Sequence, residues 1–309
     1  MPVTILAYHG VTDKASTGIE NFQGKHLTAE EFERQMRALK EQAGLLSLRD
    51  LVEAYAVGDD PDGVIVTFDD AYRNNVTVAL PILERYQVPT TFFLSTGFIG
   101  TDRMFWVDEV EQAIDQTDAA VIDFTAAGLT CFALDTREAR MLAVTEIKAH
   151  LKRVPEDEKN RLLALLKAAA MPRSGSVKSA NYETMSWDDV RRLAESSIVE
   201  LGGHTIDHAI LSRLSEDQIR EQVVRSKEQL EDETGCDITL FAYPNGGAAD
   251  YTPASIEILK DSGYICACTT LPGVNTSETS VYELRRTMAG FCGEPFPFPL
   301  APPAQARRS

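Results

Sequence analysis

Val64-Ile65-Val66-Thr67-Phe68-Asp69-Asp70 is the stretch of sequence that decides the fold. Its first five residues are apolar or β-branched, which predicts a strand buried on both faces, as in a parallel sheet covered by helices. The two aspartates follow directly, so we expect them at the carboxyl end of that strand, where barrel enzymes carry their active sites. Taken alone, two aspartates after a strand fit a turn or a helix cap at least as well.

Similar apolar runs alternate with amphipathic helical stretches along most of the 309 residues. This alternation predicts an α/β fold in which helices pack outside a parallel sheet. Seven or eight strands of this kind suit a barrel. The predicted strands are Val3–Tyr8, Leu45–Leu48, Val64–Phe68, Thr91–Ser95, Ile198–Leu201, Thr239–Tyr243, Ile265–Thr269 and Tyr282–Arg286.

Helix signals mark two of the connections and one long insertion. Thr28 begins one predicted helix, and Ser215 and Gly235 begin and end another. The alternation fails over residues 101–181, which we interpret as a helical insertion with helices over Thr145–His150 and Glu156–Ala170. The insertion interrupts a catalytic barrel predicted for residues 1–290, and the Pro-rich residues 291–309 are expected to form an irregular tail.

Charge and composition exclude several classes of function. The chain carries 30 Lys and Arg against 47 Asp and Glu, a net charge of −17, so a nucleic acid partner is not expected. The N-terminus does not read as a secretory signal, and no apolar run approaches the length of a transmembrane segment. Five scattered cysteines fit a reducing compartment better than a disulfide framework, so we expect a cytoplasmic protein.

A second polar loop follows the strand predicted at Ile198–Leu201 and contains two histidines. His204 and His208 are four positions apart, a spacing that lets two imidazoles converge on one metal ion. For two histidines alone a surface position is an equal alternative, but the nearby pair of aspartates favours metal binding. A catalytic metal site needs about three protein ligands and an open position, which two histidines and one carboxylate provide. The other carboxylate is then free to accept a proton from water.

These motifs resemble those of the polysaccharide deacetylase family of carbohydrate esterases (family 4), whose catalytic unit is the chitooligosaccharide deacetylase, or NodB, homology domain. The resemblance rests on Thr67-Phe68-Asp69-Asp70 and His204-Thr205-x-x-His208, with further landmarks in the same order over roughly residues 1–100 and 180–290. The further landmarks are Ala7-Tyr8-His9-Gly10-Val11, His26-Leu27 with Phe32 and Gln35, Pro81-Ile82-Leu83, Phe241-Ala242-Tyr243-Pro244-Asn245-Gly246, Gly263-Tyr264 and Leu284-Arg285-Arg286.

The resemblance implies a deformed (β/α) barrel of seven or eight strands, one divalent metal ion, and hydrolysis of an N-acetylated sugar to a free amine and acetate. Matched position by position, it implies that Asp69 is the catalytic base and that Asp70, His204 and His208 are the metal ligands. Zinc is the expected metal, and cobalt, nickel, manganese or iron would accept a similar ligand set.

Some positions depart from the family pattern. Where the third motif commonly has an Arg that orients the base, this chain has Ala242, and Arg286 is our candidate for that role, with an ordinary structural ion pair as an equal alternative. The aromatic residue whose backbone N–H helps to bind the oxyanion is replaced by Asn245, which keeps a main-chain donor. In the family a Leu packs on the acetyl methyl group, and Leu284 matches it. The predicted substrate-binding residues are Tyr243, Asn245, Leu284 and Arg286.

The histidine that protonates the leaving amine in the family has no counterpart after Leu284. His9 directly follows the first strand, on the barrel rim expected for Asp69, so we predict that His9 is the general acid; a hydrogen bond within its own loop is the alternative. Trp106 opens the insertion and is predicted to pack in a core rather than to stack on a sugar.

Together these features predict a metal-dependent N-deacetylase whose partner is an N-acetylated saccharide. Two alternatives stay open. One is an amidase of the same fold that acts on a non-sugar amide, such as a cyclic ureide or a small acylated amine. The other is an inactive saccharide-binding module. The sequence does not indicate the oligomeric state.

Overall fold

The structure is a computed structural model that describes residues 2–14, 16–172, 175–290 and 293–300. Its centre is a seven-stranded sheet in the order β10-β9-β8-β5-β4-β1-β11, in which every neighbouring pair is parallel. The parallel α/β fold is therefore confirmed. The strands are β1 (Thr4–Tyr8), β4 (Val64–Phe68), β5 (Thr90–Leu94), β8 (Val199–Gly203), β9 (Leu240–Ala242), β10 (Cys266–Cys268) and β11 (Thr287–Met288).

One segment near the C-terminus contacts both edges of this sheet. Thr287 and Met288 pair with β1, while Leu284 forms a parallel bridge to Cys268 of β10. The sheet therefore curls into the deformed barrel that the family resemblance implied. Because successive side chains of a strand point to opposite faces, each central strand contributes both to the interior core and to the core under the outer helices.

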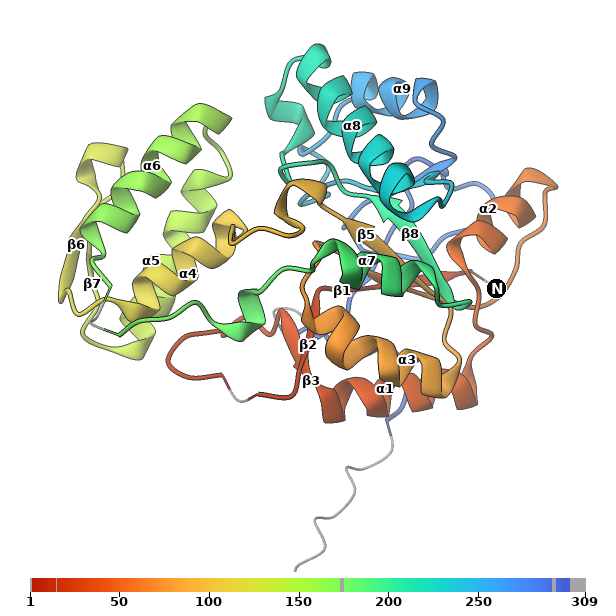
Figure 1. Ribbon diagram of the computed structural model, residues 1–309, viewed down its shortest axis with the longest axis horizontal. Coiled ribbons are helices and arrows are strands. Elements are labelled where there is room, and N and C mark those ends of the chain that lie inside the picture. The colour runs from red at the N-terminus through yellow and green to blue at the C-terminus, as the bar shows by residue number, and fades with distance from the viewer. Residues whose placement is uncertain (1, 15, 173–174, 291–292, 301–309) are drawn as a thin grey trace, which may run out of the picture.

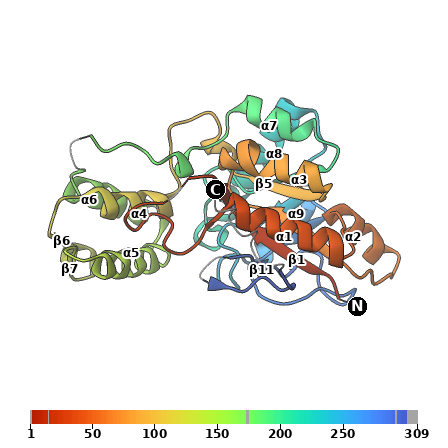
Figure 2. The same ribbon diagram turned by 90° about the horizontal axis from the view of Figure 1, so that it is seen from below.

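Helices surround the curled sheet (Figures 1 and 2). They are α1 (Ala29–Gln42), α2 (Leu48–Ala56), α3 (Leu80–Tyr86), α7 (Trp187–Ala194), α8 (Glu216–Thr234) and α9 (Pro253–Asp261). A π-helix precedes α3 at Asn75–Ala79, and β2 (Gly10–Thr12) pairs with β3 (His26–Thr28) ahead of α1. The predicted helix ends are confirmed: Thr28 accepts the Glu31 N–H at the start of α1, and Ser215 and Gly235 cap α8.

Two predicted strands differ from the structure. Leu45–Leu48 is not a strand: Leu45 forms a single bridge to Val64, and α2 begins at Leu48. Ser47 and Asp50 form a capping box there, and this local hydrogen bonding prevails over the short apolar run. Of the strand predicted at Tyr282–Arg286, only the bridge at Leu284 is present, and β11 begins one residue beyond that range.

The region predicted as a helical insertion stands beside the barrel in both views (Figures 1 and 2). It contains α4 (Trp106–Gln116), α5 (Arg137–Leu151), α6 (Glu156–Ala169) and an antiparallel hairpin of β6 (Val121–Asp123) and β7 (Cys131–Ala133). It has a hydrophobic core of its own, separate from those of the barrel. No sequence pattern predicted the hairpin, because each of its strands is three residues long and buries only the middle one.

The end of the chain is described in part. Of the predicted tail, residues 293–300 are described, whereas residues 291–292 and 301–309 lie outside the described ranges. Phe296 and Phe298 pack against the outer core of the barrel, and the Gln42 side chain donates a hydrogen bond to the Pro299 carbonyl (3.0 Å). Within the described ranges, no helix combines the length and the apolar character needed to cross a bilayer.

Candidate active site

The predicted site residues lie on loops at the carboxyl ends of the parallel strands. His9 follows β1, Asp69 and Asp70 follow β4, and His204 follows β8. Ser95, which follows β5, is fully buried and holds two of these loops together. Its N–H donates to the Asp70 carbonyl (2.8 Å) and its hydroxyl donates to the His204 carbonyl (2.8 Å). The sheet therefore positions the acidic and imidazole side chains through main-chain bonds, and no motif had marked Ser95 for this role.

Backbone strain is concentrated on the same loops. Of the seven non-glycine residues with positive φ in the described chain, five follow β4, β8 or β9: Asp70 (85°), Ala71 (140°), Thr205 (65°), His208 (53°) and Asn245 (60°). Such conformations cost of order 1–3 kcal/mol each and persist only where the surrounding structure fixes them. The chain therefore maintains an unfavourable backbone where its candidate ligands are placed.

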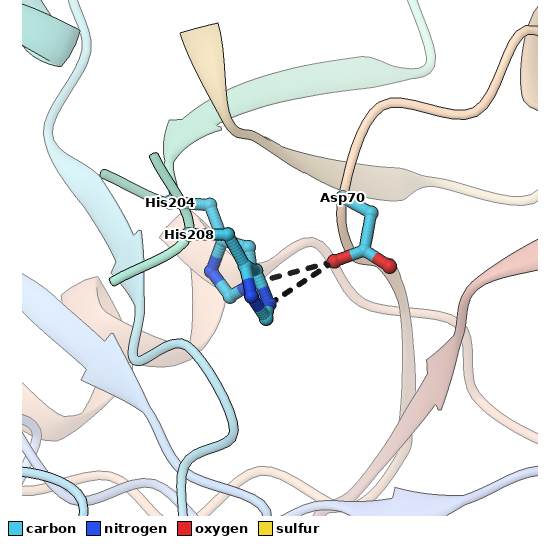
Figure 3. Close-up of side chains that lie close together, drawn as sticks. All are labelled: Asp70, His204 and His208. Carbon is cyan, nitrogen blue, oxygen red and sulfur yellow. Dashed lines mark ion pairs between the residues drawn. The ribbon is translucent and has the colours of Figure 1, made fainter. Parts of the chain in front are cut away.

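Three side chains converge on one point at this edge of the barrel (Figure 3). The Oδ1 atom of Asp70 lies 3.3 Å from Nε2 of His208 and 3.7 Å from Nε2 of His204. Ligand atoms of the three residues all lie within 4.8 Å of one another. The structure thus brings together the residues predicted as metal ligands, although Asp70 is more than a hundred positions from the two histidines in sequence.

His204 presents a lone pair rather than a proton to this point. Nδ1 of His204 lies 2.7 Å from the Ala242 carbonyl, which can only accept, so Nδ1 carries the proton and Nε2 is left with a lone pair. Burial lowers the pKa of both imidazoles, and the pKa of His208 lies well below its ordinary value. Neutral imidazoles of this kind are the form that binds metal.

Asp70 completes a donor set that fits a divalent ion. Oδ1 of Asp70 is buried and has no hydrogen-bond donor among the described residues. Burial raises the pKa of this carboxyl to about 6, with the charges of His9 and Lys25 acting against the rise. A buried carboxylate oxygen without a donor is costly unless a cation balances it. Asp70, His204 and His208 therefore match one divalent metal in number, type and protonation state.

Asp69 has a different environment from its neighbour. Arg286, fully buried, donates from Nη1 to Oδ1 and from Nη2 to Oδ2 of Asp69, both at 2.7 Å. Arg286 is itself fixed by the Thr269 carbonyl (2.7 Å) and the Thr67 hydroxyl (3.2 Å). Burial alone would raise the pKa of Asp69, but the charge of Arg286, the charge of His204 and the Arg286 hydrogen bonds together outweigh burial and hold the pKa well below the ordinary value. Asp69 is thus kept ionised and oriented next to the candidate metal ligands.

A pocket of about 380 Å³ opens over these residues. His9 and Asn245 line it, as do Asp69 and the three candidate ligands. Burial lowers the pKa of His9, while the carboxylates Asp70 and Asp69 act in the opposite direction. Nδ2 of Asn245 is buried without an acceptor among the described residues, so a polar group of a ligand could satisfy it.

Three of the four predicted substrate-binding residues do not line this pocket. Arg286 is fully buried and holds Asp69 instead. Tyr243 is fully buried, its ring stacks on Tyr251, and its hydroxyl donates to the Tyr282 carbonyl (3.0 Å). Leu284 is fully buried in the core inside the barrel, where its bridge to β10 holds it. Both are therefore structural residues, and the apolar contact on the barrel side of the pocket comes from Met288 instead.

The far side of the pocket was not predicted. It is formed by the insertion, through Trp106, Val107 and Glu111 of α4 and Lys148, Ala149 and Lys152 at the end of α5. Trp106 was expected to pack in a core, and it does belong to the insertion's core, but it also faces this pocket. No sequence motif marks these lysines as pocket residues, because basic residues are common near the C-terminal end of a helix, where they interact favourably with the helix dipole.

The family model described as polysaccharide deacetylase matches residues 56–123 and 152–267 of the chain. The chain belongs to the polysaccharide deacetylase family. The matched segments carry Asp69, Asp70, His204 and His208, and the stretch between them, residues 124–151, includes β7 and α5. The wall that α5 contributes to the pocket of this polysaccharide deacetylase therefore lies outside the part that the family model matches.

Relatives agree with this assignment. Poly-beta-1,6-N-acetyl-D-glucosamine N-deacetylase of Staphylococcus epidermidis is 31% identical over 106 residues, 31% of this chain and 37% of that protein, so the match spans little more than a third of the relative. The Streptococcus pyogenes deacetylase PplD in complex with acetate has a TM-score of 0.61 at 17% identity, covering 94% of this chain and 93% of that chain. IcaB from Ammonifex degensii has a TM-score of 0.60 at 18% identity, covering 93% of this chain and 91% of that chain. These two structures show a shared fold.

Proposed function

We propose that this polysaccharide deacetylase uses one divalent metal ion to hydrolyse the acetamido group of an N-acetylated saccharide, releasing a free amine and acetate. The supporting observation is the convergence of Asp70, His204 and His208 beside an ionised Asp69 that Arg286 orients. Zinc is the proposed metal, because two imidazoles and one carboxylate with an open position are typical of catalytic zinc sites. The name of the staphylococcal relative supports the saccharide.

Each residue of the site has a proposed part in the reaction. A divalent ion held by Asp70, His204 and His208 would polarise the amide carbonyl and lower the pKa of water. Asp69 accepts the proton of the attacking water, because it is ionised and both of its oxygens are held in place.

The remaining roles concern the substrate's oxygen and nitrogen. Asn245 is the proposed donor to the oxygen that becomes negatively charged, through its main-chain N–H. His9 is the proposed donor of the proton to the departing nitrogen. Burial lowers its pKa, and the carboxylates of Asp70 and Asp69 act against this loss of the protonated form. Both residues line the pocket that contains the candidate ligands.

The test uses purified protein stripped with a chelator and reloaded with zinc. It is incubated with N-acetylglucosamine oligomers, and released acetate is measured beside an Asp69→Asn variant. The proposal expects acetate only from the reloaded wild type, with at least a hundredfold loss in the variant. Asn keeps the size and one acceptor of Asp69, and circular dichroism checks that the variant is folded.

Other results would replace the proposal. Release of a product from non-sugar amides but not from saccharides would favour the amidase alternative. Saccharide binding without any turnover would favour a binding module. Acetate release that is undiminished after stripping, with no metal found by elemental analysis, would contradict the metal dependence.

A further inference from the structure

The metal pocket is bounded on two sides by contacts between the barrel and the insertion. On one side Lys25, from the loop before β3, forms an ion pair with Asp108 of α4. Its ammonium group also donates a hydrogen bond to the Tyr72 hydroxyl (2.7 Å). The Tyr72 hydroxyl in turn donates to Asp108 (2.5 Å). Asp108 is 1% exposed, so this contact is buried, and Lys25 itself lines the pocket.

On the other side Lys152 reaches from the end of α5 to the loop after β9. Its Nζ lies 2.9 Å from Oδ2 of Asp250. Asp250 is 4% exposed and is held by the Gly247 N–H, which donates to the same oxygen (2.9 Å). Lys152 lines the pocket together with Asn245 of the same loop, so this ion pair links the two walls beside the candidate metal ligands.

A second cleft shares a lining residue with the pocket. Trp106 lines the pocket and also a cleft of about 420 Å³ between the insertion and the start of α8. The indole N–H of Trp106 is buried without an acceptor among the described residues. The cleft is polar: Arg103 forms an ion pair with Asp207 (2.9 Å), which also accepts from Gln222 (2.9 Å). An aromatic ring beside fixed polar groups suits a sugar.

The charges of the pocket wall favour an uncharged ligand. Lys25, Lys148 and Lys152 line the pocket, and each forms an ion pair with a carboxylate, those of Asp108, Glu111 and Asp250 respectively. A sugar phosphate or a uronate would have to compete with these partners, whereas a neutral saccharide would not.

We propose that the pocket binds the terminal N-acetylated residue of a neutral oligosaccharide. The residues that follow it extend past Trp106 into the second cleft. The Lys152–Asp250 ion pair prevents the saccharide from continuing in the other direction. The inference rests on the proposed function, and it specifies which position of a saccharide is hydrolysed. Each cavity lies at the small end of the range of ligand pockets, about 300–1,000 Å³, which suits short saccharide units rather than a polymer strand running through.

The test maps the position of the first free amine. Zinc-loaded enzyme is incubated briefly with a β-1,6-linked N-acetylglucosamine hexamer labelled at its reducing end, and tandem mass spectrometry locates the deacetylated residue. We expect wild type to act at one end of the hexamer. Lys152→Ala, which removes the ion pair, should raise the interior fraction severalfold, while the matched Lys152→Arg variant, which keeps the charge, should stay close to wild type.

The outcomes separate this inference from the function on which it depends. Interior amines as the first products of wild type would overturn the inference and leave the deacetylase function standing. A terminal product whose position does not change in Lys152→Ala would overturn the role of the ion pair. Absence of acetate from every saccharide would remove the proposed function, and the inference with it. Binding of dimer, tetramer and hexamer to Asp69→Asn, measured by calorimetry, gives a readout without turnover: affinity should rise from dimer to tetramer, and equal affinities would contradict the second cleft.

Discussion

The two walls of the pocket are built in different ways. The barrel wall consists of strand ends, a strained backbone and a buried Asp69–Arg286 pair. The insertion wall consists of side chains of α4 and α5 such as Trp106, and of Lys152 at the end of α5, which is 41% exposed and forms an ion pair with Asp250. We interpret the barrel wall as the part that performs the chemistry and the insertion wall as the part that selects the substrate. If so, changes in the first should alter metal binding and kcat, and changes in the second should alter KM and product pattern.

His204→Ala should have the largest effect. It removes one of the three proposed ligands, so the several kcal/mol by which the metal would stabilise the transition state should be lost. That loss corresponds to at least about a 10³-fold fall in activity. Elemental analysis after dialysis should find most of the metal gone. His150→Ala in the insertion is the matched control and should keep its metal. Full metal content in His204→Ala would contradict the ligand assignment.

His9→Gln should lower kcat by about 10²-fold or more, because a general acid contributes typically 10²–10⁴-fold. Metal content should stay at the wild-type level, since His9 is not one of the proposed ligands. Steady-state kinetics beside elemental analysis checks both expectations. Unchanged kcat would show that His9 only forms hydrogen bonds in its own loop.

Arg286→Met should change the pH dependence of the reaction. Asp69 works as a base only when ionised, so activity falls as the pH drops through its pKa, which Arg286 holds well below the ordinary value. Without Arg286 the burial remains and the attraction is lost, so this pKa rises and the acid limb of kcat/KM should move to higher pH. Breaking a buried ion pair also destabilises the fold by about 3–5 kcal/mol.

Arg286→Lys tests the same prediction if the Arg286→Met variant does not fold. Lys keeps the positive charge but loses the two-pronged contact with Asp69, so we expect a smaller shift of the acid limb in the same direction. Acid limbs that coincide in wild type and both variants would contradict the positioning role of Arg286.

Trp106→Phe should have the smallest effect and should separate the two walls most clearly. Phe preserves packing in the insertion core but removes the indole N–H, whose proposed hydrogen bond to the saccharide would contribute about 1 kcal/mol, or roughly fivefold in binding. We expect KM for a tetramer to rise by about that factor with kcat and metal content unchanged. Trp187→Phe on α7, away from the pocket, is the control. A fall in kcat without a change in KM would contradict the division between the walls.

The barrel wall could be predicted from the sequence because its signals are local and ordered. Buried strands directly precede Asp69 and His204, and parallel strands bring their carboxyl ends to one edge. The resemblance then implied that Asp69, and not Asp70, is the base. For Arg286, the sequence left two equal alternatives: orienting the base, or forming an ordinary structural ion pair. Only the structure shows that Arg286 reaches Asp69. The cytoplasmic location stays a prediction.

The insertion wall could not be predicted, for physical reasons. Lys148 and Lys152 reach the pocket only because α5 packs against α4 in a separate core, and that packing depends on contacts across the whole insertion. Tyr243 and Leu284 were misplaced because a motif match gives a position in sequence but not the face of a strand. Ser95 acts through its backbone and hydroxyl, which no composition signal distinguishes from an ordinary strand end.

The positive φ angles at the barrel rim bear on attempts to make this protein more heat-resistant. Ala71, at φ 140°, occupies a region that glycine enters without a steric penalty, so Ala71→Gly is a replacement that a search for higher melting temperature would select early. The same replacement frees the main chain next to Asp70. Selection for heat resistance alone would therefore favour variants that survive heating but hold Asp70, a proposed metal ligand, less firmly, and stabilising changes are better sought at the opposite end of the strands.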